Sequence, residues 1–227
     1  MKVRKFLLGL LASVCACSAV SAQVEVSGGV DFVSDYVWRG VEQGQGAALQ
    51  PGMSVTAGNF TLGAWGSTGL GLSDAFNGKE LDFTLGYEVG GFSISLTDYW
   101  WDGQGAAYFE STAHQLEASV GYSFGEAFPL GITWSTMVAG AYDEDNYSTY
   151  INFSYPFSVS AVDCEVNLGI TPWAGAYADG FDICSVSARF SYNLVETDKF
   201  TLPIFVETIF APAMDDAFIV AGLSFAM

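Results

Sequence analysis

The chain has 227 residues, about half of them hydrophobic, and 25 acidic side chains against seven basic ones. This excess of negative charge argues against nucleic acid and anionic membrane surfaces as partners, and it fits cationic solutes or divalent cations better. Beyond residue 22 no run reaches the roughly 18 to 20 apolar residues that a membrane helix needs. If the chain spans a membrane, it therefore spans it with strands.

The first residues predict a secretory signal peptide over 1–22. Three basic residues precede an apolar run that begins at Phe6 and ends in the small-residue segment Val20–Ala22. Cleavage after Ala22 is favoured over a lipoprotein signal, because the residues before Cys15 lack the expected leucine. The mature chain, 23–227, then keeps four basic residues against all 25 acidic ones, a net charge of −21.

Twelve segments of alternating apolar and polar residues follow, joined alternately by short turns and by longer polar loops. The ascending strands are expected near Val24–Arg39, Phe60–Gly66, Phe92–Trp101, Leu130–Ala139, Val162–Trp173 and Lys199–Phe210. The descending strands are expected near Leu49–Ala57, Glu80–Val89, His114–Phe124, Tyr147–Phe157, Phe181–Tyr192 and Ala217–Phe225. This pattern predicts an all-β fold, a single antiparallel transmembrane β-barrel of about 12 strands with short periplasmic turns and longer extracellular loops.

Side-chain alternation separates a lipid face from a lumen face. In Glu80–Val89, for example, every second residue is a large apolar one. A secreted β-sandwich also alternates, but the near absence of Lys and Arg on the strands favours the barrel, as do the aromatic residues at the strand ends. The lipid-facing aromatic girdles are predicted to contain Tyr36, Trp38, Trp100 and Tyr147 above, and Phe92, Tyr122, Phe124, Tyr155, Phe157 and Tyr192 below. Pro203 predicts a bulge or a lost ladder bond in its strand.

The most specific local string is Ser34–Gly40, with the sequence SDYVWRG. In a continuous strand Asp35 and Arg39 share the lumen face, so Arg39 is expected to pair with Asp35. One interpretation is a structural ion pair that fixes the strand. The other is a constriction near the outer mouth, where a charged pair selects what passes.

The same string resembles the N-terminal S-D-Y-x-x-R-G signature of the TorF family, outer-membrane barrels assigned as porins. The loop Val41–Gly46 supplies the small polar residues that follow the signature in that family. The resemblance covers the mature chain in length and strand rhythm. It implies an outer-membrane location and a channel role, with no established substrate.

Charged residues of lumen parity are the candidate selectivity residues. They are Asp31, Asp35, Arg39, Asp82, Glu88, Glu117, Glu165, Arg189 and Glu207. If the lumen is open, this acidic lining attracts cations and repels anions, so the solute is expected to be cationic or neutral. Alternatively, the same groups bond one another and plug the lumen.

No catalytic, cofactor or metal site is expected. His114 is the only histidine, and Leu116 stands where an outer-membrane phospholipase would carry its serine. The acidic loop Asp143–Asn146 and the pair Asp215–Asp216 suggest calcium, but they lack EF-hand spacing. A solvated loop, bridged to lipopolysaccharide by divalent cations, is the more ordinary interpretation.

The two mature cysteines are predicted to be free thiols. Both have lipid-facing parity, and the hairpin register places Cys164 near Phe190 at the periplasmic end and Cys184 near the outer rim. A disulfide needs Cα atoms within roughly 7 Å, which this separation excludes.

The sequence therefore predicts a porin-like outer-membrane channel for small solutes. The alternative is a structural or surface-interaction barrel without conductance. The expected partners are outer-membrane lipid and lipopolysaccharide, small solutes and the barrel-assembly machinery, which would read the last strand through the outward-facing Phe225.

Overall fold

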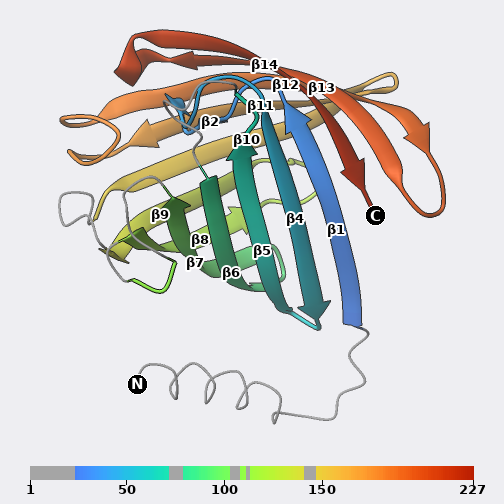
Figure 1. Cartoon of the computed structure of the whole chain (residues 1–227), viewed down its shortest axis with the longest axis horizontal. Coiled ribbons are helices and arrows are strands. Elements are labelled where there is room, and N and C mark those ends of the chain that lie inside the picture. The colour runs from blue at the N-terminus through green and yellow to red at the C-terminus, as the bar shows by residue number, and fades with distance from the viewer. Residues whose placement is uncertain (1–23, 72–78, 103–107, 111–112, 141–146) are drawn as a thin grey trace.

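The computed structural model describes residues 24–71, 79–102, 108–110, 113–140 and 147–227. The predicted signal peptide and the acidic loop at 143–146 lie outside these residues. Twelve antiparallel strands form one closed barrel in which β1 pairs with both β4 and β14 (Figure 1). The expected fold class is confirmed. The strands are β1 (Val24–Val33), β4 (Ala48–Ala57), β5 (Phe60–Gly69), β6 (Lys79–Val89), β7 (Phe92–Asp102), β8 (His114–Ser123), β9 (Gly131–Gly140), β10 (Thr149–Val159), β11 (Val162–Thr171), β12 (Asp182–Glu196), β13 (Thr201–Ala211) and β14 (Asp216–Ala226).

The connections differ at the two ends of the barrel. At one end, here called the turn end, the strands are joined by short turns, such as Gly58–Asn59 between β4 and β5 and Gly90–Gly91 between β6 and β7. Gly90 and Gly91 have φ of +58° and +82°, the left-handed conformation of a type I′ hairpin turn. At the other end, here called the loop end, the connections are mostly longer. A short 3-10 helix (Pro212–Met214) joins β13 to β14 there.

The outer surface of the barrel is apolar. Val26 of β1 is 69% exposed and Ile219 of β14 is 74% exposed, while Val220, the next residue of β14, is only 6% exposed. The aromatic residues predicted near the turn end are exposed as expected, namely Phe92, Tyr122, Phe124, Tyr155, Phe157 and Tyr192. No helix among the described residues is both long enough and apolar enough to cross a membrane.

The irregularity expected at Pro203 is present. Pro203 pairs with Asn193 of β12, and the register between β12 and β13 shifts between Asn193 and Val195. Because proline has no N–H to donate, the neighbouring strand accommodates it with an extra residue, Leu194.

The first strand is shorter than its alternation predicts. β1 ends at Val33, and the chain then folds into a two-rung hairpin of β2 (Val37–Trp38) and β3 (Val41–Glu42). Arg39 and Gly40 form its turn, with φ of +53° and +84°. The prediction of one strand running to Arg39 is therefore wrong, because the strand stops at Val33 and residues 34–36 lead into the hairpin, whose turn at Arg39-Gly40 reverses the chain. We call the segment Tyr36–Gln43 the inner hairpin, since its residues Tyr36, Val37 and Arg39 contact the lumen wall.

Candidate functional site

The turn of the inner hairpin is tied to the far wall of the barrel. Arg39 donates from Nη1 to Glu117 Oε2 at 2.6 Å and from Nη2 to Glu117 Oε1 at 2.9 Å. Nη1 also donates to the hydroxyl of Tyr177 at 2.5 Å. Glu117 lies on β8, across the barrel from β1, and the two side chains are only 12% and 3% exposed. The predicted pairing of Arg39 with Asp35 is wrong, because the hairpin turn places Arg39 far from β1 and against β8.

Aromatic rings surround the same guanidinium. Its Cζ lies 4.3 Å from the ring centroid of Trp38, 4.8 Å from that of Tyr150 and 5.7 Å from that of Tyr177. Cation–π attraction strengthens when the cation is desolvated, as it is here. Burial by itself lowers the pKa of Arg39, but the Tyr177 oxygen and the bond to Glu117 outweigh burial and raise it. Burial also raises the pKa of Tyr177 to about 12, so this residue keeps its phenolic proton at neutral pH.

A second anchor holds the start of the inner hairpin. The Tyr36 hydroxyl donates to Glu80 Oε2 of β6 at 2.9 Å, and the Tyr36 ring packs edge-on against Trp65 at 5.6 Å between centroids. Tyr36 and Val37 also pack against an inward apolar cluster that includes Phe205 and Ile209. The predicted lipid-facing positions of Tyr36 and Trp38 were therefore wrong, because both rings lie inside the barrel.

Gly40 fits the hairpin tip against the wall with no room for a side chain. A Cβ at this position would collide with the backbone carbonyl of Cys184 and lie 3.1 Å from the Cβ of Ala211. Cys184 packs with Tyr150 and Tyr177 and faces the lumen, so its predicted lipid-facing position was wrong. The cause is a bulge, since the register between β11 and β12 shifts at Gly169 and reverses the parity expected for Cys184.

The cysteine chemistry agrees with expectation. Cys164 pairs in register with Phe190, as predicted, and both Cys164 and Cys184 are free thiols.

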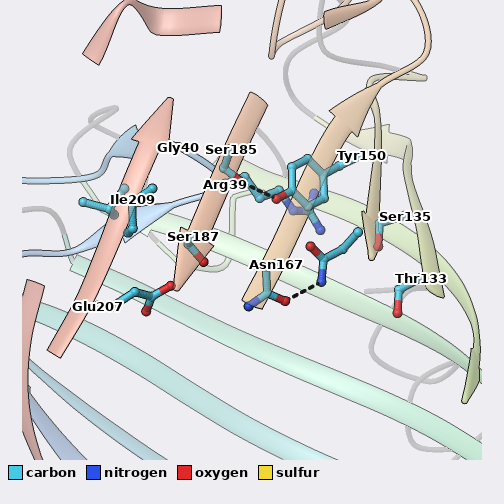
Figure 2. Close-up of a pocket in the computed structure, with 12 residues that line it drawn as sticks. Arg39, Gly40, Thr133, Ser135, Tyr150, Asn167, Ser185, Ser187, Glu207 and Ile209 are labelled. Atoms are coloured by element: carbon cyan, nitrogen blue, oxygen red, sulfur yellow. Dashed lines mark hydrogen bonds between the residues drawn. The ribbon is translucent and has the colours of Figure 1, made fainter. Parts of the chain in front are cut away.

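A polar cavity of about 330 Å³ lies beside the inner hairpin within the lumen. Figure 2 shows Arg39 next to the Tyr150 ring on one side of this cavity, with Ser187 and Glu207 on the other. Hydroxyl and amide groups line much of it, and two of its bonds join Tyr150 to Ser185 at 2.8 Å and Asn152 to Asn167 at 3.1 Å. The inner hairpin narrows the lumen without filling it.

The remaining predicted residues are distributed along the lumen wall. Glu165, Arg189 and Glu207 lie in register on three neighbouring strands, and Arg189 approaches Glu207 at 3.8 Å. Asp31 borders a cavity of about 450 Å³ towards the turn end. Asp82 is buried on β6 near the second anchor, and Glu88 is exposed at the turn end of the same strand. Asp35 follows β1 and lies outside any strand.

Several residues of this site were not predicted from the sequence. They are Tyr36, Trp38, Glu80, Tyr99, Tyr150 and Tyr177. Tyr99 and Tyr150 have lumen parity and could have been found from their alternation, whereas Tyr177 is a loop residue with no periodic signal. The Arg39-Gly40 dipeptide was the available signal for the inward turn, since glycine favours a positive φ.

His114 lies outside the lumen near the loop end. Its Nδ1 is 3.0 Å from Asp98 Oδ1, and its Nε2 is 2.6 Å from the backbone oxygen of Tyr108. Within the part of the chain that the structure describes, no group of three or more His, Cys, Asp or Glu residues could hold a metal ion.

The fold and the inward hairpin define a class of twelve-stranded β-barrel with a loop fixed inside its lumen. A family model described as "Bacterial protein of unknown function (Gcw_chp)" matches residues 17–182, so the chain belongs to this family. No curated protein sequence matches.

Several solved structures of membrane proteins are similar to this chain, all at low sequence identity. A chain from work on the in-meso crystallization of membrane proteins has 10% identity and a TM-score of 0.46, covering 89% of this chain and 83% of the other. A mutant of the Rh. blastica porin has 10% identity and a TM-score of 0.37, covering 90% and 99%. Wzi, a carbohydrate-binding outer-membrane β-barrel of Escherichia coli, has 9% identity and a TM-score of 0.32, covering 80% and 51%.

Proposed function

We propose that this protein is a porin-like barrel of the bacterial outer membrane, with its loop end extracellular and its turn end periplasmic. The exposed apolar side chains on strands around the barrel support this location, because a soluble protein rarely leaves such a continuous apolar surface in water. Closure of the sheet leaves no strand edge to be solvated in hydrocarbon.

The observation that carries the channel function is the polar, acid-lined lumen beside the inner hairpin. The cavity beside Arg39 is about 330 Å³ and the one bordered by Asp31 is about 450 Å³, which are sizes that admit small solutes. Carboxylates exceed basic groups along the lumen, so the permeant solutes are cationic or neutral. In this proposal the inner hairpin is the constriction, with Arg39 at its turn.

A non-conducting structural barrel is the second candidate. The bidentate bond of Arg39 to Glu117, together with the anchor of Tyr36 on Glu80, favours it, because both bonds fix the inner hairpin across the lumen. If the barrel is non-conducting, variants that lack either anchor should also show no conductance.

Reconstitution in planar bilayers separates the two candidates. Discrete conductance steps, with a cation preference under a salt gradient, are expected of the channel. The preference should weaken in concentrated salt, where the screening length falls to about 3 Å near 1 M. Silence of both the natural protein and the Arg39→Gly variant, after correct folding is verified by heat-modifiable mobility, would favour the non-conducting barrel.

A further inference from the structure

The wall opposite β1 has the composition of a binding site for a guanidinium group. The wall contributes four side chains around Arg39, namely Tyr99 of β7, Glu117 of β8, Tyr150 of β10 and Tyr177 between β11 and β12. Among the aromatic rings that face the guanidinium, Trp38 alone comes from the inner hairpin. Most of the site therefore belongs to the barrel and remains when Arg39 is withdrawn.

Bonds within the wall hold three of these side chains, Tyr99, Glu117 and Tyr150, in place independently of Arg39. The Tyr99 hydroxyl donates to Glu117 Oε1 at 3.0 Å, and the Tyr99 ring stacks on Trp101 with centroids 5.4 Å apart. Tyr150 shares a hydrogen bond of 2.8 Å with Ser185. A site whose groups are already oriented loses little freedom when it binds a ligand.

The geometry selects guanidinium over other cations. Both carboxylate oxygens of Glu117 accept from the two Nη atoms of Arg39, and this paired arrangement matches a planar guanidinium rather than a spherical ion. Without that partner, Glu117 would keep a buried negative charge, which is costly. The aromatic faces of Tyr150 and Tyr177 add cation–π attraction.

A solute in the lumen can reach this site. Arg39 and Tyr150 both line the cavity of about 330 Å³ (Figure 2). The inner hairpin itself has a ladder of only two residue pairs, Val37 with Glu42 and Trp38 with Val41. Its position in the lumen therefore depends on its anchors to the wall.

We propose that this wall is a receptor site for solutes that carry a guanidinium group, that Arg39 occupies the site in the resting protein, and that such a solute displaces the inner hairpin. The inference rests on the proposed channel function, names a substrate class for it, and couples binding to opening.

Binding is tested by calorimetry with guanidinium chloride on the detergent-folded Arg39→Gly variant. Glycine adopts the positive φ of position 39 without strain, so the variant keeps the turn while it vacates the site. It should bind guanidinium at least about tenfold more tightly than tetramethylammonium, and adding Glu117→Gln should remove this preference. Equal binding of the two cations, or binding unaffected by Glu117→Gln, would overturn the proposed site.

If the double variant does not fold, Tyr177→Phe in the Arg39→Gly background takes its place. Loss of the hydroxyl beside the vacated position should weaken guanidinium binding several-fold. An unchanged affinity would count against the site.

Displacement is tested by alkylation of Cys184, which lies under Gly40, in a Cys164→Ser background. Guanidinium should accelerate the reaction of Cys184 with a water-soluble maleimide in bilayer vesicles, and tetramethylammonium at equal concentration should not. Equal rates would overturn displacement. Neither measurement uses an ionic current, so a silent bilayer recording contradicts the channel function without contradicting the site.

Discussion

The two halves of the lumen share one alternating strand pattern but differ in how they are filled. In the half nearer the loop end, Arg39 of the inner hairpin forms a buried polar cluster with Glu117 and Tyr177 of the barrel wall. In the half nearer the turn end, small residues such as Gly29 and Gly63 line a cavity of about 450 Å³. Alternation thus determines which side chains face inward, while their size and charge determine how much of the lumen they fill.

Removing Glu117 should produce the largest effect on this contrast. Glu117→Ala leaves Arg39 buried without its counter-charge, and breaking a buried pair in this way costs about 3–5 kcal/mol. The free energy of unfolding, measured by urea titration of the vesicle-inserted protein, should fall by this order.

Glu88→Gln is the matched control for Glu117→Ala. Glu88 faces the same lumen from β6, but it is exposed at the turn end, so its loss should change stability by less than about 0.5 kcal/mol. Equal losses from the two variants would show that the two halves are not energetically distinct.

Glycine replacements test packing in the two halves. A Cβ at Gly169 would collide with the Tyr150 ring, whereas at Gly63 the nearest atoms are 3.9 Å away. Gly169→Ala should therefore destabilise the barrel by about 1–3 kcal/mol through overpacking. Gly63→Ala should leave the unfolding midpoint nearly unchanged, and a comparable shift in both variants would contradict the difference in packing.

Charge removal at the inner hairpin should sharpen selectivity. Arg39→Gly takes a cation from an otherwise acidic lumen, so the reversal potential under a potassium chloride gradient should move further towards cation preference. Glu88→Gln should move it slightly the other way. An Arg39→Gly reversal potential equal to that of the natural protein would assign Arg39 to structure alone.

The smallest expected signal is in the thiols. Cys184 is covered by the inner hairpin, and Cys164 is only 6% exposed between its register partners Phe157 and Phe190. Neither thiol should therefore react with a charged maleimide in folded vesicles. After denaturation without reductant, mass spectrometry should find both alkylated. A bridged pair would contradict the register of β11 and β12.

Strand number, order and most boundaries follow from alternation because period 2 repeats over ten residues in each strand. The errors concern residues where the chain leaves the regular strand geometry, which the alternation of the sequence does not always reveal. Arg39-Gly40 reverses direction without disturbing alternation, and a bulge beside Gly169 turns Cys184 inward. The partnership of Arg39 with Glu117 joins residues 78 positions apart across a lumen, and no local pattern encodes such a distance.

The inner hairpin can lie close against the barrel wall only because Gly40 has no side chain. Its backbone rests where even a methyl group would meet the carbonyl of Cys184 and approach Ala211. Any larger residue must either lift the tip from the wall or push β12 outward. The absence of a Cβ at position 40 therefore determines how closely the inner hairpin approaches the wall. In the proposed channel it would also set the width of the passage.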